Sequence, residues 1–420
     1  MNAPPDEIVI LNDYASANGG SSAVAIASAV ELAAAGCRVT FFSCVGPVAP
    51  RLRDVPNLEV ICLDQPEIAR DPNRLRAFAS GLRNRHAVAV LRWVLAKKDP
   101  RRTVVHAHTW MKALSPFALH AVGELGFPLV VTLHDFFIAC PTGGFFEHRA
   151  GRQCQRQPLS FSCLRCRCDR RNYGHKLWRS ARTFLQNRWL GVPRDVAHYI
   201  GLSAFSVDLM RPHLPPGANV SIVPNPIDTV DAGPAPVAAN HDFLFVGRLV
   251  PEKGVRLFAD AVRRTGLPAT FIGDGELSAD LRRRCPGARF TGWLDAAAIR
   301  VELRRARALV FPSLWYETLG LVSIEAAAAG VPAVVSGRCA ASEHVRHLET
   351  GLHFHHGSAD ALADAMRRLN TDPGLAARLG RAAYRWYWDQ PWTADQHVAH
   401  LLRIYRSLLP AAAHPWRKVS

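Results

Sequence analysis

The stretch from Pro312 to Pro332, which reads PSLWYETLGLVSIEAAAAGVP, constrains the fold more than any other part of the chain. It follows an apolar run, continues through a short loop, and then reads as a helix from Leu319 to Ala329 that Gly330 stops. A second apolar run comes directly after the helix. A strand, loop, helix and strand in this order form one unit of a parallel sheet, because parallel strands need a long crossover that a helix usually supplies.

Two glutamates lie in this unit, Glu317 in the loop and Glu325 in the helix, with seven residues between them. Free N–H groups at a helix start attract anions, and Gly320 lets a ligand approach the backbone closely. A phosphate at the helix start with a carboxylate on either side would match the layout of a nucleotide-sugar. Acidic residues also favour helix starts, so a capping glutamate and a solvated glutamate are the alternative interpretation.

The same run closely resembles the E-x7-E signature of the retaining glycosyltransferases of family four, which have the GT-B fold. The match includes the Pro-Ser before the loop, the Leu-Gly-Leu between the glutamates and the Ala-rich helix that ends in Gly-x-Pro. The resemblance implies that Glu325 binds the donor ribose and Glu317 the donor sugar, with a catalytic role for the latter. It also implies an anion site made by the N–H groups of Thr318, Leu319 and Gly320.

A second motif, GRLVPEKG, follows the apolar run FLFV and places Lys253 five residues after Arg248. It resembles the family's phosphate-binding Gly-Arg…Lys-Gly motif. Two fixed cations can stabilise the negative charge that accumulates on a departing nucleoside diphosphate. The sequence contains no Asp-x-Asp, so we expect no metal cofactor for catalysis. Read alone, such an Arg and Lys would be solvated surface charges.

Further candidates follow other predicted strands. Gly275 and Trp293 come after ATFI and ARFTG, and their family counterparts border the nucleotide base. Gly20 opens an Ala-rich helix after the strand EIVIL; in the family this glycine loop lies near the donor phosphates, although the pattern lacks G-x-G-x-x-G and also suits a simple turn. The segment VVTLHDFF resembles the family segment with an active-site histidine, which matches His134, and His108 is a weaker candidate.

Charge and composition narrow the range of partners. The chain has 420 residues and a net charge of +16, with eleven Lys or Arg against two acids in 70–112 and twelve against one in 149–194. Such segments suggest an acidic substrate, a nucleic acid or an anionic membrane, or only a general lean toward arginine. The segment 73–98 has apolar residues at helical spacing, which we expect to face inward, although such a helix can also lie on anionic lipid. The acidic N-terminus and the lack of a membrane-length apolar run predict a cytoplasmic protein.

Half of the ten cysteines lie between Cys140 and Cys168, in a Gly- and Arg-rich insertion at about 136–176. Clustered cysteines in an intracellular protein favour a metal over a disulfide. We therefore predict a structural zinc bound by Cys140, Cys154, Cys163 and Cys166, with Cys168 as a substitute for Cys166. Free thiols, a disulfide and a metal cluster are the alternatives.

Together these features predict an α/β protein of the GT-B class, with two doubly wound Rossmann-like domains that face each other across a cleft. The predicted parts are an acceptor-side domain (1–226), a linker (227–240), a donor domain (241–383) and a C-terminal helix that packs back on the first domain (384–420). The resemblance implies a retaining transferase that uses a UDP- or GDP-sugar and a glycan or lipid-linked acceptor, with contact to anionic membrane and no nucleic acid. Alternatives are another GT-B enzyme, such as a phosphorylase or nucleotide-sugar epimerase, and a basic nucleic-acid-binding protein with a zinc-binding insertion.

Overall fold

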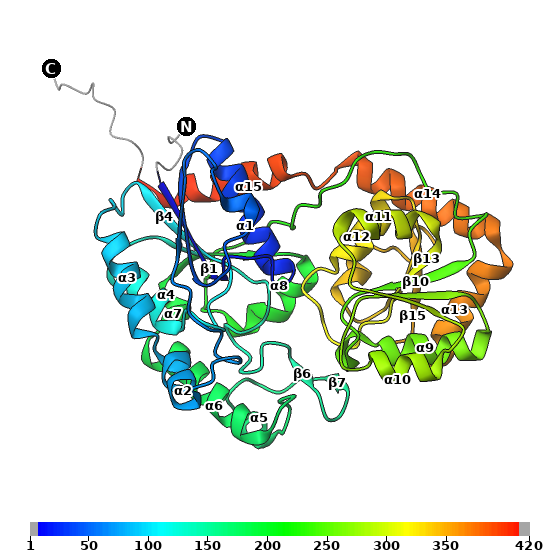
Figure 1. Ribbon diagram of the computed structural model, residues 1–420, viewed down its shortest axis with the longest axis horizontal. Coiled ribbons are helices and arrows are strands. Elements are labelled where there is room, and N and C mark those ends of the chain that lie inside the picture. The colour runs from blue at the N-terminus through cyan, green and yellow to red at the C-terminus, as the bar shows by residue number, and fades with distance from the viewer. Residues whose placement is uncertain (1–6, 411–420) are drawn as a thin grey trace.

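Two parallel β-sheets organise the chain, one built from each half (Figure 1). The computed structural model describes residues 7–410. The first sheet has the order β3-β2-β1-β4-β5-β8-β9. Its strands are β1 (Glu7–Tyr14), β2 (Arg38–Val45), β3 (Leu58–Cys62), β4 (Thr103–Ala107), β5 (Leu129–Thr132), β8 (Val196–Gly201) and β9 (Val220–Ile222). The helical segments of this unit outside the insertion are α1 (Gly20–Ala34), η1 (Pro50–Leu52), α2 (Arg74–Leu82), α3 (Arg85–Leu95), α4 (Pro116–Glu124), α7 (Val192–Asp195), α8 (Ala204–Met210) and η3 (Arg211–His213).

The second sheet has the order β12-β11-β10-β13-β14-β15. Its strands are β10 (Asp242–Val246), β11 (Ala269–Ile272), β12 (Arg289–Gly292), β13 (Ala306–Phe311), β14 (Ala333–Ser336) and β15 (Gly351–Phe354). The helical segments are η4 (Pro251–Lys253), α9 (Val255–Thr265), α10 (Ser278–Arg284), α11 (Ala296–Arg305), α12 (Leu321–Ala328), η5 (Ala340–Glu343), α13 (Ala359–Thr371) and α14 (Pro373–Asp389).

The strand order shows where ligands should bind. In each sheet the order reverses at its centre, between β1 and β4 in the first and between β10 and β13 in the second. Ligands of open α/β sheets bind outside the carboxyl ends of the strands at this switch point. The loops that follow these four strands are therefore the ones to examine.

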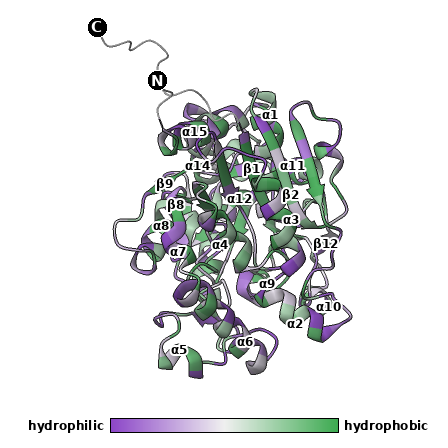
Figure 2. Cartoon of the chain, turned by 90° about the vertical axis from the view of Figure 1, so that its left-hand side faces the viewer, coloured by the Kyte–Doolittle hydropathy of each residue, from purple (hydrophilic) through white to green (hydrophobic). Residues whose placement is uncertain are grey.

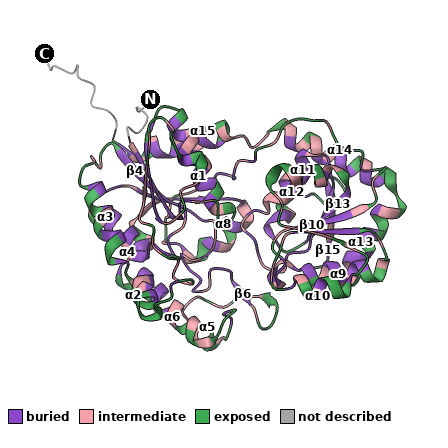
Figure 3. Ribbon diagram, in the orientation of Figure 1, coloured by how far each residue is buried: buried purple, intermediate pink, exposed green. Residues whose placement is uncertain are grey.

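Burial on both faces explains why the strands read as continuous apolar runs. Val9 and Leu11 of β1 pack into one core layer, and Ile8 and Ile10 pack into the layer on the opposite face. Because successive side chains of a strand point to opposite faces, both faces must be covered by helices. Figure 3 shows the resulting buried strands inside a more exposed helical shell.

Two further parts connect the units. The insertion comprises the antiparallel strands β6 (Phe146–Glu147) and β7 (Arg152–Gln153), α5 (Phe161–Arg165), α6 (Tyr173–Phe184) and the π-helix η2 (Leu185–Trp189). The last helix, α15 (Ala394–Leu408), packs on the first unit. His397 of α15 hydrogen-bonds Ser28 of α1 at 3.0 Å, so the end of the chain ties back to its beginning.

The segment 73–98 differs from our prediction. It forms two helices, α2 and α3, because Asn84 caps the start of α3 by accepting the N–H of Ala87. Leu91 of α3 is buried as expected, but Leu75 of α2 is 85% exposed. The prediction of an inward-facing stripe is therefore wrong for α2. Among the helices within residues 7–410, none is both long and apolar enough to cross a membrane.

Candidate active site

The loop between β13 and α12 adopts an unusual backbone. Glu317 has a φ of +57° and Gly320, the N-cap of α12, has a φ of +87°. A positive φ is rare for glutamate, and such residues cluster in binding loops. Thr318 and Leu319 lie between these two residues, so all of the N–H groups predicted to form an anion site belong to this one turn.

The carboxylate of Glu317 is held in a buried ion pair. Its Oε1 accepts hydrogen bonds from Lys253 Nζ and Ser313 Oγ, both at 2.7 Å, and the residue is only 7% exposed. Lys253 also lies over the ring of Trp315, 5.1 Å from its centroid. The sequence motifs suggested separate places for Lys253 and Glu317, whereas the structure joins them directly.

A glycine turn positions the two predicted cations. Gly254 has a φ of +68°, and a Cβ there would lie 1.8 Å from the carbonyl oxygen of Pro312, so a larger residue would force the loops apart. Lys253 stands just before this turn and points to Glu317. Arg248 has a more exposed side chain, and its Nη2 lies 3.7 Å from Glu252 Oε1. Lys253 therefore lies inside the candidate site, paired with Glu317, and Arg248 lies at its more exposed edge.

The carboxylate of Glu325 is unpaired. Within residues 7–410 it makes no hydrogen bond or ion pair. Burial raises the pKa of Glu325, and the positive charge of Arg300 partly opposes that shift. Buried polar groups usually have hydrogen-bond partners. Because this carboxylate has none among the described residues, it is free to accept hydrogen bonds from a ligand hydroxyl.

The residues predicted to border the base follow β11 and β12. A Cβ at Gly275 would lie 2.4 Å from the carbonyl oxygen of Leu249, so the loop after β11 packs tightly against the segment that follows Arg248. Trp293 is 78% exposed. The structure thus brings Gly275 next to the cation loop and leaves Trp293 with a free ring face.

The first unit meets this site at the start of α1. A Cβ placed on Gly20 would lie 3.9 Å from Leu321 Cδ1. The first residue of α1 therefore faces the first residue of α12. Thr318 Oγ1 also donates to the backbone oxygen of His134 at 3.3 Å, so the histidine segment and the E-x7-E loop are in contact.

Three histidines form a row behind this contact. His134 Nε2 and His108 Nδ1 are 2.8 Å apart, and the rings of His108 and His106 have centroids 4.3 Å apart. His106 in turn hydrogen-bonds Tyr405 of α15 at 2.6 Å. Burial, with a smaller effect of His397, lowers the pKa of His134 to about 3, so this imidazole is neutral at physiological pH.

Two aspartates that we did not predict lie beside the histidines. Asp13, at the end of β1, is fully buried and accepts hydrogen bonds from the backbone N–H groups of Lys112, Ala113 and Leu114. Asp135 follows His134, and burial raises its pKa to about 6. Both line a cavity of about 50 Å³. The available signal was their place at the carboxyl ends of β1 and β5.

The predicted zinc ligands are free thiols in the insertion. No group of three or more His, Cys, Asp or Glu side chains within residues 7–410 is arranged to hold a metal ion. Cys140, Cys154, Cys163 and Cys166 thus form no tetrahedral set. The ammonium group of the buried Lys176 lies next to one of these thiols, with its Nζ 3.3 Å from Cys163 Sγ. A structural zinc stays a prediction.

Two family descriptions match almost the whole described chain. "Glycosyltransferase Family 4" matches residues 18–231, and "Glycosyl transferases group 1" matches residues 235–386. The chain belongs to glycosyltransferase family 4. The family predicted from the E-x7-E and Gly-Arg…Lys-Gly motifs is thereby confirmed, and the two matches meet close to the segment predicted as a linker.

Relatives of this family 4 chain act on different substrates. It is 32% identical to a glycogen synthase of Mycobacterium tuberculosis over 302 residues, which are 67% of this chain and 64% of the relative. It is 28% identical to the GDP-mannose-dependent alpha-(1-6)-phosphatidylinositol monomannoside mannosyltransferase of the same species over 247 residues, 52% of this chain and 63% of the relative. The matched regions therefore span less than two thirds of these relatives.

Solved structures confirm the GT-B fold. Sucrose-phosphate synthase from Thermosynechococcus elongatus aligns with a TM-score of 0.71 and 20% identity, over 96% of this chain and 99% of the other. HepE from Anabaena in complex with UDP aligns with a TM-score of 0.66 and 17% identity, over 96% of this chain and 100% of the other. The predicted arrangement of two Rossmann-like sheets is correct.

Proposed function

We propose that this family 4 chain is a retaining glycosyltransferase that moves a sugar from a nucleoside diphosphate-sugar to a hydroxyl group of a glycan or lipid-linked acceptor. One observation carries the proposal: the Lys253–Glu317 ion pair lies at the switch point of the second sheet, directly before α12, the helix that holds the unpaired carboxylate of Glu325. The loop that contains Glu317 faces the neutral His134 of the first sheet. A diphosphate with a ribose on one side and a sugar on the other fits this order of groups.

In this proposal the second unit binds the donor. Glu325 accepts hydrogen bonds from the ribose hydroxyls, and the turn at Thr318, Leu319 and Gly320 contributes backbone N–H groups to the diphosphate. Arg248 and Lys253 stabilise the charge that grows on the diphosphate as the glycosidic bond breaks. Since this charge is largest in the transition state, the two cations act mainly on turnover.

His134 and Glu317 act near the transferred sugar. An imidazole with a pKa of about 3 carries no charge at neutral pH, so His134 accepts or donates one hydrogen bond without repelling a positively charged sugar ring in the transition state. Glu317 is already fixed by Lys253 and Ser313. Its remaining oxygen binds a sugar hydroxyl, and the ion pair prevents that carboxylate from moving.

We propose a UDP- or GDP-sugar as donor. The similar HepE structure is a complex with UDP, and the mannosyltransferase relative is GDP-mannose-dependent. In this proposal Gly275 and Trp293 border the base, and backbone contacts there would accept either base. A thermal-shift screen with UDP, GDP and the other nucleoside diphosphates tests this, since a ligand at 100 times its dissociation constant stabilises by about 2.7 kcal/mol.

Product analysis separates the alternatives. A phosphorylase would form a sugar phosphate from inorganic phosphate, and an epimerase would change the nucleotide-sugar without an acceptor. A glycosyltransferase releases the nucleoside diphosphate only as the acceptor is glycosylated, and a retaining one keeps the anomeric configuration. Nucleotide release measured with and without candidate acceptors, followed by NMR of the product, decides among them.

We further propose that the first unit contacts an anionic membrane at the cytoplasmic face. Helices α2 and α6 touch through the rings of Phe78 and Trp178, whose centroids are 5.9 Å apart. Hydrophobic and hydrophilic residues lie next to each other on α2, α5 and α6 (Figure 2). Large apolar side chains exposed on α2, α5, α6 and η2 are Leu75, Phe78, Phe161, Leu177, Phe184 and Trp189. Such side chains among arginines are typical of proteins that bind the membrane interface.

Vesicle sedimentation tests the membrane proposal. We expect binding to anionic and not to neutral vesicles, with loss at high salt, since each basic residue near the surface adds about 1 kcal/mol. Trp189→Ala should weaken binding, whereas Leu348→Ala, which changes an exposed apolar residue of the second unit, should not. Equal binding to both vesicle types would contradict the proposal.

A further inference from the structure

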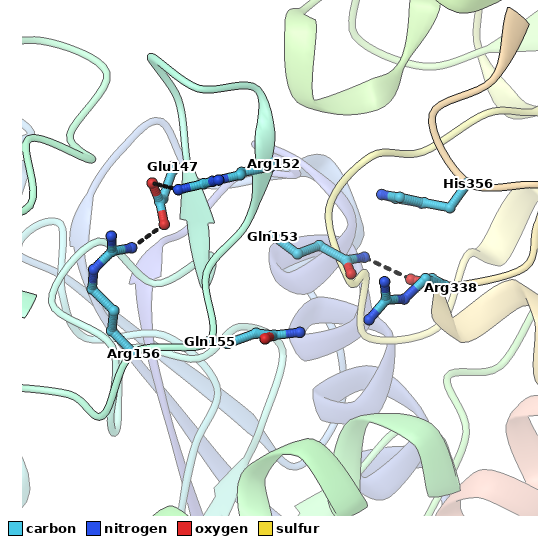
Figure 4. Close-up of a pocket in the computed structure, with 7 residues that line it drawn as sticks. All are labelled: Glu147, Arg152, Gln153, Gln155, Arg156, Arg338 and His356. Carbon is cyan, nitrogen blue, oxygen red and sulfur yellow. Dashed lines mark hydrogen bonds and ion pairs between the residues drawn. The ribbon is translucent and has the colours of Figure 1, made fainter.

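A second polar pocket lies where the insertion reaches the second unit (Figure 4). It has a volume of about 530 Å³. Its walls come from the β6–β7 hairpin and from the segments after β14 and β15. The lining residues are Glu147, Arg152, Gln153, Gln155, Arg156, Arg338 and His356.

The hairpin is fixed to the second unit at this pocket. Gln153 Nε2 donates to the backbone oxygen of Arg338 at 2.7 Å. A Cβ on Gly144, just before β6, would lie 3.4 Å from the ring of Trp315, so the base of the hairpin packs on the loop that contains Glu317. The pocket therefore exists only where the two units meet.

The pocket has a net positive charge. Glu147 forms ion pairs with Arg156 and Arg152. Arg338 makes no side-chain hydrogen bond or ion pair within residues 7–410. The three arginines and the one glutamate that line the pocket therefore give it a net charge of +2. In Figure 4, Arg338 and Gln155 extend toward each other from opposite walls, and His356 projects into the same space.

The pocket is close to the proposed transfer site but separate from it. Arg338 precedes η5, and Ala340 at the start of η5 donates its N–H to the backbone oxygen of Tyr316 at 2.8 Å. Tyr316 directly precedes Glu317. In the proposed function the donor diphosphate has its own cations, Arg248 and Lys253, so this second cationic pocket is available for a different anionic group.

We propose that this pocket binds a phosphate group carried by the acceptor, an inference that rests on the proposed transferase function. A phosphate monoester carries a charge of about −1.5 to −2 at pH 7, which matches the net charge of the pocket. Arginine binds phosphate oxygens in a bidentate manner, and the side-chain amides of Gln153 and Gln155 add neutral donors. A lipid-linked diphosphate and a sugar phosphate share this chemistry.

The first experiment uses the full chain with the donor cations removed. In an Arg248→Ala/Lys253→Ala/Glu317→Gln background, in which no buried carboxylate loses its partner, we expect calorimetry with inorganic pyrophosphate to detect one site. Arg338→Ala should weaken this binding at least tenfold, and Arg152→Ala, on the opposite wall, should also weaken it. The matched control is Arg346→Ala, which changes an exposed arginine of the same unit that pairs with Glu349 outside the pocket and should have no effect.

Pyrophosphate binding that is absent in this background, or that is unaffected by both pocket variants, or that Arg346→Ala weakens equally, would overturn the proposal. Failure of the proposed function is distinguishable, because it appears as absent nucleotide binding in the wild-type protein. The sources of phosphate are compared with geranyl diphosphate and glucose 1-phosphate: the one that binds more tightly, and loses that binding in Arg338→Ala, identifies the class of acceptor.

Discussion

The two walls of the proposed site, one from each unit, handle charge in opposite ways. The wall formed by the second unit has Arg248 at its rim and pairs Lys253 with Glu317. The wall formed by the first unit keeps His134 uncharged by burial and raises the pKa of Asp135 to about 6. A diphosphate needs fixed positive charge, whereas a sugar that becomes positively charged in the transition state must not meet a nearby cation. In our proposal the second unit therefore binds the diphosphate, and the reacting sugar lies between Glu317 of that unit and the uncharged His134 of the first.

The largest effect on stability is expected from the buried, uncharged His134 of the first unit. Folding lowers the pKa of His134 from 6.5 to about 3, so the unfolded chain binds a proton first as the pH falls. Stability is therefore lost between pH 6.5 and 3, by up to about 5 kcal/mol from this group. His134→Gln should flatten that acid loss in chemical denaturation series, while His86→Gln, at an exposed position, should leave it unchanged.

Breaking the Lys253–Glu317 ion pair of the second unit should destabilise the protein nearly as much. Lys253→Ala leaves the Glu317 carboxylate buried without its partner, which destabilises proteins by about 3–5 kcal/mol. The double variant Lys253→Ala/Glu317→Gln should regain most of that stability but none of the turnover. Equal stability of the single and double variants would show that the pair is not coupled. Lys97→Ala, which changes an exposed lysine over Trp93, is the control.

Asp135 should give a pH dependence of the opposite sign to that of His134. Folding raises its pKa from 3.8 to about 6, so the folded chain keeps its proton longer as the pH rises. Stability from this group falls between pH 4 and 6, by up to about 3 kcal/mol. Asp135→Asn should therefore stabilise the protein at pH 7 and not at pH 3.5. Asp208→Asn, at an exposed position, should change neither value.

The smallest effect on stability is expected where the insertion contacts the second unit. Arg170 pairs with Glu276 at 2.6 Å, but both side chains are partly exposed. Such pairs contribute about 0.2–1 kcal/mol, so Arg170→Ala should hardly change unfolding. It should instead speed proteolysis of the insertion at low salt, compared with Arg149→Ala. No difference between these two variants would mean that the pair does not hold the insertion in place.

The extent to which the sequence predicted the structure differs between these regions. The E-x7-E loop, both sheets and the cation motif follow from local patterns, because a parallel strand buried on two faces and a glycine turn leave clear signals. The direct bond between Lys253 and Glu317 joins loops 64 residues apart, and no local pattern reports such a contact. Asp13 was missed because its role depends on backbone donors about 100 residues away.

The insertion shows the limit most clearly. Its cysteine spacing predicts a zinc site, which stays a prediction, and that spacing does not reveal that the chain places Lys176 next to Cys163. The exposed Leu75 was also unexpected, since its spacing alone cannot tell an inward stripe from an outward one. In both cases tertiary packing decides.

The central claim is that the second unit binds a nucleoside diphosphate with Glu325 on the ribose. Calorimetry of UDP and GDP with the wild-type chain and with Glu325→Ala tests it most directly, with Glu59→Ala as an exposed control on the first unit. Hydrogen bonds to a charged group contribute about 1.5–3 kcal/mol, so we expect one site whose affinity falls about tenfold or more in Glu325→Ala and stays unchanged in Glu59→Ala. Nucleotide affinity that is unaltered in Glu325→Ala would contradict the ribose assignment, and the absence of binding by any nucleoside diphosphate would contradict the account as a whole.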